Sequence, residues 1–167
     1  GQGWGAGPVS PSLWNDWDTY DQTYNKVDGV FKTDPRRSAS VCDIPSELPN
    51  YTYGGGGWAD MVQETDYYQK KLGPITCATA DGTGYYATFE CRMFPNQWGN
   101  KINDMQLDNI HDLILIRFAD VLLMQSELEG SVDGINKVRA RAGLPNIAAY
   151  SLSALQQERR FELSCEG

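Results

Sequence analysis

The sequence predicts a mainly α-helical protein in which helical hairpins support a loop-rich, aromatic-bearing face with few short strands. Apolar residues recur at helical spacing in the last third of the chain. The first two thirds hold most of the glycines and show little helical periodicity. The length of 167 residues allows one domain with a modest hydrophobic core.

The last third of the chain, residues 112–167, contains three predicted helices joined by short links. The first helix covers residues 112–129, and its apolar side chains share one broad face: Leu115, Ala119, Leu122 and Leu123. Gly130 follows it, where a glycine in the left-handed conformation commonly ends a helix.

Two further helices are predicted from their start and stop signals. The second begins near Ile135, and Gly143 followed by Pro145 predicts its end. Ser153 and Gln156 have the spacing of a capping box and predict the start of the third. None of the helices can bury its apolar face alone, so they must pack together. The two helical hairpins predict a tetratricopeptide-like packing, although no repeat of fixed period occurs.

Short elements separated by loops are predicted in the first two thirds. Ser12 is a candidate N-cap for a helix over residues 13–20 that places Leu13, Trp17 and Tyr20 on one side. Other segments predict strands or turns: residues 31–44 after Pro35, residues 65–72, and residues 85–93. The glycine run at residues 54–57 predicts an exposed loop.

Several motifs occur in the order and at the spacing of a known family. In the last third they cover residues 116–124, 135–145 and 158–163, followed by Glu166-Gly167. Upstream, residues 65–72 and Asp34-Pro35-Arg36 fit two shorter motifs, with Asp66 in place of a usual glycine. Over residues 30–167 the chain therefore resembles the SusD/RagB family of glycan-binding outer-membrane lipoproteins.

The resemblance implies a larger protein and a cellular setting. Family members are longer, with an N-terminal half of helical repeats, so we expect an internal or C-terminal portion. Residues 1–111 would form the loop-rich, ligand-facing region of a SusD-like domain, and residues 112–167 its helical-repeat region. Apolar surface on these helices should then be exposed, with Arg160 and Phe161 as contact candidates. The family lies over a SusC-like TonB-dependent transporter, held by a lipid anchor that would lie outside these residues.

Composition excludes several kinds of partner. The formal net charge is −8 and no basic stripe is present, which argues against nucleic acid. The longest apolar run, residues 113–124, is interrupted by Arg117 and Asp120 and is too short to span a membrane. The cysteines lack paired C-x-x-C spacing, which argues against zinc. Their disulfide pairing is left open: Cys42, Cys77, Cys91 and Cys165.

Tryptophans in glycine-rich or polar segments are the candidate ligand-binding residues. An aromatic ring stacks on the C–H face of a sugar, while neighbouring amide and carboxylate groups bind its hydroxyls. Trp58 follows four glycines, and Trp98 lies in a turn beside two amide side chains. The alternative is that each tryptophan anchors its loop against the core. The predicted ligand-binding set is Trp58, Trp98, Asn96, Gln97, Asp60, Trp4 and Trp14.

Catalytic patterns are weak in this sequence. His111 is the only histidine, which excludes a histidine-based triad or a multi-histidine metal site within these residues. The acidic candidates for catalysis or calcium binding, which we expect to be solvated, are Asp16, Asp18, Asp104, Asp108 and Asp112. Another charged set predicts salt bridges between packed helices: Arg117, Asp120, Arg159, Arg160 and Glu162. We therefore predict no catalytic residue, no metal and no cofactor.

The resemblance and the aromatic residues together predict non-catalytic capture of an oligosaccharide, or another nutrient, and its delivery to the transporter. Two alternatives remain. One is a helical-repeat subunit that binds a peptide or a protein partner and has no sugar site. The other is a glycoside hydrolase that uses two of the acidic residues. A carboxyl pair in a cleft would favour the hydrolase, whereas aromatic residues on an exposed face favour the glycan binder.

Overall fold

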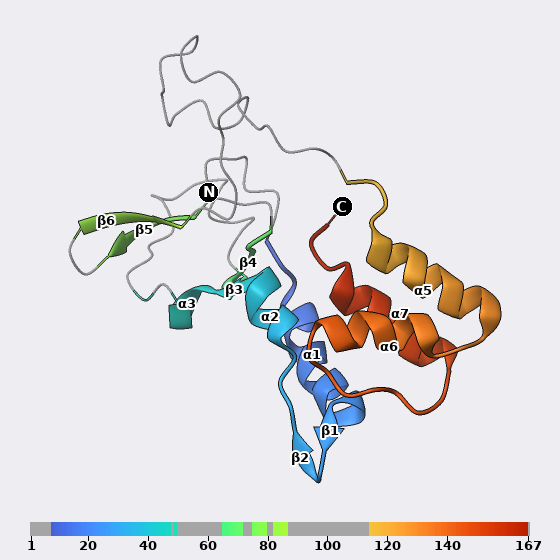
Figure 1. The fold of residues 1–167 in the computed structure, drawn as a ribbon. Coiled ribbons are helices and arrows are strands. Elements are labelled where there is room, and N and C mark those ends of the chain that lie inside the picture. The colour runs from blue at the N-terminus through green and yellow to red at the C-terminus, as the bar shows by residue number, and fades with distance from the viewer. Residues whose placement is uncertain are drawn as a thin grey trace. The chain divides into compact units, whose positions relative to one another are not determined.

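The computed structural model describes residues 8–47, 49, 65–71, 75–79, 82–86 and 114–166. Within these residues the protein is mainly helical, with short strands in pairs (Figure 1). The chain divides into two compact units, which are described separately. The helical unit comprises residues 12–40 and 114–167, and the strand unit comprises residues 1–11 and 41–113.

The helical unit is built around three C-terminal helices that pack on one another, as the sequence predicts. Their shared core is a cluster of buried side chains: Ala119, Leu123, Ile135, Val138 and Leu155. The elements of the unit are α1 (Pro11–Tyr24), β1 (Lys26–Val27), β2 (Val30–Phe31), α2 (Pro35–Ser40), α5 (Phe118–Glu129), α6 (Asp133–Arg141) and α7 (Leu152–Glu162).

Helix α5 begins later than predicted. The expected start at residue 112 is wrong, because Arg117 is extended (φ −124°, ψ 165°) and the helix begins at Phe118. The extended backbone accompanies hydrogen bonds from the Arg117 side chain to α7 and the segment after it. The predicted end is confirmed, since Gly130 is left-handed (φ 61°) and its N–H bonds the carbonyl of Ser126.

Helices α5 and α6 meet backbone to backbone. A Cβ atom added to Gly134 would lie 1.9 Å from the carbonyl oxygen of Leu122, so only glycine fits at this contact. The hydroxyl of Ser126 accepts a hydrogen bond of 2.9 Å from the backbone N–H of Ile135 at the same crossing. Small and polar groups therefore set the close approach of the two helices.

Helix α7 is capped by Ser151, so the prediction of a capping box at Ser153 is wrong. Ser151 is extended, and its hydroxyl accepts a hydrogen bond of 3.1 Å from the N–H of Ala154. Tyr150 packs against the apolar core just before it, which fixes where the chain enters the helix. Ser153 consequently falls inside the first turn.

Helix α1 is longer than the predicted 13–20. Pro11 occupies its first turn, where proline is tolerated, so Ser12 lies inside the helix and is not its N-cap. Trp17 and Tyr20 are buried, as their spacing predicts, and both rings contact Phe161, with centroids 4.6 and 4.7 Å away. These rings form an aromatic cluster between α1 and α7.

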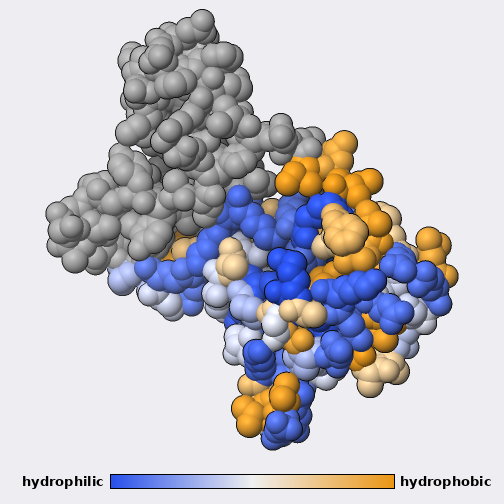
Figure 2. Space-filling model, in the orientation of Figure 1, coloured by the Kyte–Doolittle hydropathy of each residue, from blue (hydrophilic) through white to orange (hydrophobic). Residues whose placement is uncertain are grey.

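A short hairpin, β1–β2, follows α1. Its two-residue turn is Asp28-Gly29, and both residues have positive φ (50° and 82°), as a type I′ turn requires. The apolar side chains of the hairpin are exposed at the lower tip of the molecule in Figure 2: Val27, Val30 and Phe31. Lys32, just after the hairpin, donates a hydrogen bond of 2.5 Å to the carbonyl of Gly143, which follows α6.

Helix α2 lies within residues 31–44, ahead of the short strand predicted there. Pro35 starts the helix, because its fixed φ suits a first helical position. The carboxylate of Asp34 accepts a hydrogen bond of 2.9 Å from the N–H of Arg36, in the manner of an N-cap. After this helix comes β3 (Val41–Asp43), which confirms the predicted short strand.

The strand unit contains two antiparallel pairs among its described residues. β3 pairs with β4 (Tyr67–Gln69), so that Cys42 lies opposite Tyr68, and this confirms the strand alternative for residues 65–72. β5 (Ile75–Thr79) pairs with β6 (Gly82–Tyr86). The short helix α3 (Ile44–Glu47) follows β3. The predicted strand at residues 85–93 coincides with β6 at its first two residues, and its remainder lies outside the described residues.

Asp66 adopts the left-handed conformation, with φ 61°. This is the position at which the family motif usually has glycine. Glycine enters this region without steric cost, and aspartate is among the residues that tolerate it best. The carbonyl of Asp66 accepts a hydrogen bond of 3.0 Å from the N–H of Ile44, which holds the turn before β4.

Helix α5 also carries apolar residues on its outer side. Phe118, Val121 and Leu128 recur at helical spacing and are 74%, 47% and 89% exposed. The segment before the helix extends this apolar surface, which gathers beside α5 at the right of Figure 2: Ile114, Leu115 and Ile116. Phe161 does not contribute as expected, because it is fully buried. In the described residues, no helix combines the length and apolar character that a membrane span needs.

Candidate functional site

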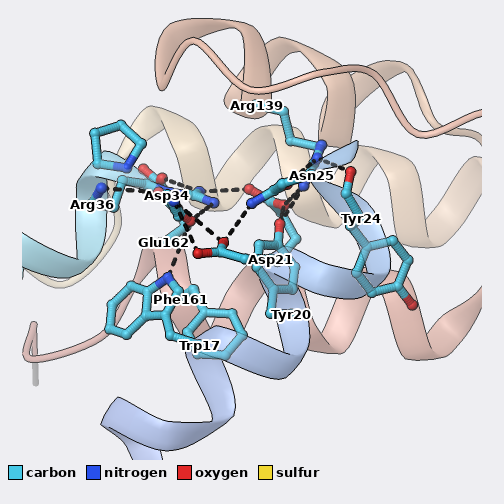
Figure 3. Close-up of polar contacts among 12 residues, drawn as sticks. Trp17, Tyr20, Asp21, Tyr24, Asn25, Asp34, Arg36, Arg139, Phe161 and Glu162 are labelled. Atoms are coloured by element: carbon cyan, nitrogen blue, oxygen red, sulfur yellow. Dashed lines mark hydrogen bonds and ion pairs between the residues drawn. The ribbon is translucent and has the colours of Figure 1, made fainter. Parts of the chain in front are cut away.

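A buried charged network joins the sequence motifs inside the helical unit. Its members come from α2 and the residue before it, from α6 and from α7, and at least nine tenths of each is buried: Asp34, Arg36, Arg139, Glu158 and Glu162. Figure 3 shows most of these side chains converging beside the aromatic cluster. Buried charges are stable only when they are paired and hydrogen-bonded, so the geometry of each pair matters.

Arg36 lies at the centre of the network. Its guanidinium donates to Asp34 at 2.7 Å, to Glu158 at 2.6 Å and to Glu162 at 2.8 Å. Asp34 also accepts a 3.1 Å hydrogen bond from the indole N–H of Trp17. The planar arginine fork thus connects Asp34, two residues before it, with Glu158 and Glu162, which both lie on α7.

Arg139 forms the second half of the network and is fully buried. It donates to Glu158 at 3.1 Å and also to Tyr20, whose hydroxyl in turn donates to Glu158. Its other N–H groups reach three more oxygens: Asn25 Oδ1 at 2.7 Å, the carbonyl of Tyr24 at 2.9 Å and the carbonyl of Pro145 at 2.7 Å. The side chain therefore joins α1, α6 and α7.

Arg117 and Arg141 extend the network toward the surface. Arg117 donates to the Glu162 carboxylate at 2.7 Å and to Glu166 at 2.5 Å, and Arg141 contacts Glu162 at 2.6 Å. The predicted salt bridges between packed helices are confirmed for Arg117 with Glu162 and for Arg159 with Asp120, whose charged atoms are 3.7 Å apart. These ion pairs connect α7 with α5 and with the residue before α5.

The network shifts the pKa values of its members. Burial alone raises the pKa of Glu162, but hydrogen bonds from Arg36 and Arg117 outweigh burial and hold it below its ordinary value. Burial raises the pKa of Tyr20 well above its ordinary value, and the Glu158 charge adds to this. Burial also raises the pKa of Asp21, which accepts hydrogen bonds from Asn25 and from the N–H of Asp34.

The chemistry of this network is structural. Asp34, Glu158 and Glu162 each form at least one ion pair with an arginine, and these pairs connect α2, α6 and α7. The Tyr20 hydroxyl, whose pKa is raised by burial, stays protonated and donates to Glu158. Among the described residues, no group of three or more histidine, cysteine, aspartate or glutamate side chains is placed to hold a metal ion.

Most of the predicted ligand-binding residues lie outside the described residues: Trp4, Trp58, Asp60, Asn96, Gln97 and Trp98. Trp14 is described and lies half-buried on α1. The guanidinium of Arg37 stacks over its ring at 3.9 Å from the centroid, and Arg37 also pairs with Asp18 at 2.5 Å. Because the other candidates lie outside the described residues, the predicted role of Trp14 stays a prediction.

A groove between α1 and α7, not predicted from the sequence, offers a further candidate site. Its volume is about 310 Å³. It is lined by Asp16, Thr19, Tyr20, Thr23 and Tyr24 from α1, and by Ser153, Gln157 and Arg160 from α7. The recurrence of polar and aromatic residues at helical spacing in α1 is the sequence signal for one wall. The second wall comes from α7, and the sequence does not predict it because it depends on how α7 crosses α1.

The fold and the charged network define a mainly helical domain whose sequence motifs meet in its interior. The profile of the SusD family matches residues 1–167, and the chain belongs to this family. No curated protein and no solved structure gave a significant match. The family assignment confirms the resemblance carried by the motifs. SusD proteins are a non-catalytic binding family, and membership implies glycan or nutrient binding together with SusC transporters.

Proposed function

We propose that this chain captures an oligosaccharide, or another nutrient, at the outer-membrane surface and delivers it to a SusC-like TonB-dependent transporter. The observation that carries the proposal is the match of the SusD family over the whole sequence. In this proposal the protein is a lipoprotein held at the surface by a lipid anchor, and it catalyses no reaction. Its ligand-facing residues lie within 1–111, and its helical-repeat region is 112–167.

The charged groups of the helical unit support a binding role. The buried carboxylates Glu158 and Glu162 are paired with arginines in the interior, where they hold helices together. Of the acidic residues that the sequence offered to a hydrolase, Asp16 and Asp18 are described, and each pairs with an arginine. A retaining or inverting hydrolase instead needs two carboxyl groups facing a substrate across a cleft.

The packing of α5 and α6 supports the tetratricopeptide-like part of the proposal. The two helices form a hairpin through Gly130, and their backbones touch at Gly134. Helix α7 then packs against both. Such hairpins stack side by side in helical-repeat proteins, where each unit buries its apolar face against the next.

We further propose that Trp58 and Trp98 stack on the glycan, with Asp60, Asn96 and Gln97 as hydroxyl partners. Loss of one stacking ring should cost about 1–2 kcal/mol, by analogy with base stacking on aromatic side chains. Binding should therefore weaken roughly tenfold, since about 1.4 kcal/mol is a factor of ten. Isothermal titration calorimetry of Trp58→Ala and Trp98→Ala with the glycan selected from an array of oligosaccharides tests this.

Phe31→Ala is the matched control, because Phe31 is an exposed aromatic outside the predicted set. It should leave affinity unchanged, and thermal unfolding should show that all variants fold. Equal affinity in the parent, Trp58→Ala and Trp98→Ala would reject these tryptophans as the site. Release of reducing ends from a bound glycan would favour the hydrolase, and binding of peptides in place of glycans would favour the peptide-uptake alternative.

A further inference from the structure

We propose that the groove between α1 and α7 is a second binding site, which takes a single neutral sugar ring. The inference depends on the proposed function for its biological role, whereas its chemistry comes from the groove itself. The groove belongs entirely to the helical unit and shares no residue with the tryptophan site proposed above.

The size of the groove fits a small ligand. Its volume of about 310 Å³ is at the lower end of the range of roughly 300–1,000 Å³ found for ligand pockets. At about 30 Å³ per water molecule, it holds roughly ten waters. This is the scale of one hexose ring, and an extended oligosaccharide would have to project out of the groove.

The aromatic part of the groove is held in place before any ligand binds. Tyr20 is fixed by hydrogen bonds with Glu158 and Arg139, and its ring packs on Phe161 at 4.7 Å. The Tyr24 ring lies 5.4 Å from that of Tyr20, and Arg139 holds the Tyr24 backbone carbonyl at 2.9 Å. A ring that is already ordered loses little entropy when a ligand stacks on it. Tyr24, which is only half-buried, is the stacking surface.

Polar side chains around the rings have hydrogen-bond donors and acceptors that can bind a ligand. Within the described part of the chain, the side chains of Thr19, Ser153 and Gln157 form no hydrogen bond. Thr23 donates to the carbonyl of Thr19 at 2.7 Å and keeps its hydroxyl lone pairs for a ligand. Hydroxyl and amide groups both donate and accept, which matches the hydroxyls of a sugar.

The charges at the groove cancel. Asp16 and Arg160 form an ion pair of 2.6 Å across its rim. Both side chains are more than two fifths exposed, so the pair contributes little to stability but leaves no net charge for an ionic ligand. The formal net charge of the chain, −8, further disfavours anions. A neutral sugar is therefore favoured over a uronic or sialic acid.

The test uses the full chain and saturation-transfer NMR with methyl α-glucoside, methyl α-galactoside, methyl α-mannoside and glucuronate as probes. At least one neutral glycoside should bind several-fold more tightly than glucuronate. Gln157→Ala should weaken that binding, whereas Gln156→Ala, on the exposed neighbouring residue, should not. Tyr24→Ala should weaken it further and should fold, because Arg139 contacts the backbone of Tyr24 and not its ring.

A charge variant gives an independent readout. Asp16→Asn leaves Arg160 without its partner and makes the groove positive. Glucuronate affinity should then rise about fivefold, since one exposed charge contact is worth on the order of 1 kcal/mol. Affinity for the neutral glycoside should stay within about twofold of the parent.

The outcomes separate the two proposals. Failure of every neutral glycoside to bind, or binding that Tyr24→Ala and Gln157→Ala both leave unchanged, overturns the groove site. Oligosaccharide binding that depends on Trp58 or Trp98 in the same samples would still support the proposed function. Binding in the groove while both tryptophan variants bind oligosaccharide normally would support the groove and reject the tryptophan site.

Discussion

Arg36 and Glu158 are 122 positions apart in the sequence, yet their charged groups lie 2.6 Å apart in the interior of the helical unit. Arg36 belongs to the short helix α2 and Glu158 to the last helix, α7. The same arginine also holds Asp34 and Glu162. One side chain therefore joins the two separate sequence segments of the unit.

Replacing Arg36 by alanine should strongly destabilise the helical unit. The change leaves the buried carboxylates of Asp34, Glu158 and Glu162 with fewer partners, and removal of one member of a buried pair costs about 3–5 kcal/mol. Urea unfolding followed by far-UV circular dichroism, which reports on the helices, measures this. The matched control is Arg37→Ala, which removes an ion pair with the 59% exposed Asp18 and a stacking contact with Trp14, and it should cost less, about 1–2 kcal/mol. Equal losses in the two variants would contradict a central role for Arg36.

Stability should fall in acid because of Glu162. Its pKa is lower in the folded protein than in the unfolded chain, where it is about 4.3. The stabilisation is therefore complete above about pH 5 and is lost as pH falls through the lowered folded pKa. Unfolding free energies measured from pH 7 to pH 3 test this. Glu162→Gln should be less stable at pH 7 and should lose less on acidification than the parent does.

Asp21 should act with the opposite sign. Burial raises its pKa in the folded state, so its contribution is complete below the ordinary value of about 3.9 and is lost as pH rises through the raised pKa. In Asp21→Asn the free energy of unfolding should therefore fall more steeply than in the parent when pH drops from 6 to 4. A parallel pH dependence in the two proteins would contradict this. The measurement is again the free energy of unfolding as a function of pH, made on the parent and on Asp21→Asn.

Gly134→Ala should destabilise the contact of α5 with α6. Alanine normally favours a helix over glycine by about 1 kcal/mol, but here its Cβ would overlap the Leu122 carbonyl at 1.9 Å. Moving a backbone apart should cost about 1–3 kcal/mol or more. Gly130→Ala is the comparison, since nothing lies within 4 Å of the added atom and only the left-handed backbone (φ 61°) is strained. Thermal unfolding should rank Gly134→Ala as the more damaging change.

Asp66 offers a stabilising substitution in the strand unit. Asp66→Gly removes the steric cost of its left-handed backbone (φ 61°) and should be neutral or stabilising by up to about 1 kcal/mol. Asp66→Val should cost about 1–2 kcal/mol or more, because a β-branched residue is disfavoured there. Hydrogen exchange at the Ile44 amide, which bonds Asp66, reports on this turn. Faster exchange in Asp66→Gly than in Asp66→Val would contradict the conformational argument.

Local patterns in the sequence predicted the packed helices and their ends well. Gly130 and Gly143 are both left-handed, as their places after predicted helices indicate. The start of α5 could not be predicted in this way, because the side-chain partners of Arg117 lie 45 and 49 residues away. Similarly, Ser151 and Ser153 are equivalent by composition, and the packing of Tyr150 selects the first as the cap.

The candidate sites, too, depend on contacts between distant segments that local sequence patterns do not predict. Helical spacing in α1 indicates that Asp16, Tyr20 and Tyr24 share a side, but spacing does not reveal which helix faces them. The motif at residues 34–36 indicated the family without showing that Arg36 contacts Glu158. A pair of this kind depends on tertiary packing, and sequence separation gives no information about it.

The helical unit is interrupted in sequence, because residues 41–113 belong to the strand unit. During synthesis the ribosome therefore releases Trp17 and Arg36 more than a hundred residues before Phe161 and Glu158, with which they pack. At about 5–20 residues per second, this delay lasts several seconds to tens of seconds. For that time Arg36 has Asp34 as a partner but lacks Glu158 and Glu162, and Trp17 lacks Phe161, so the core of the helical unit is completed only after α7 is released.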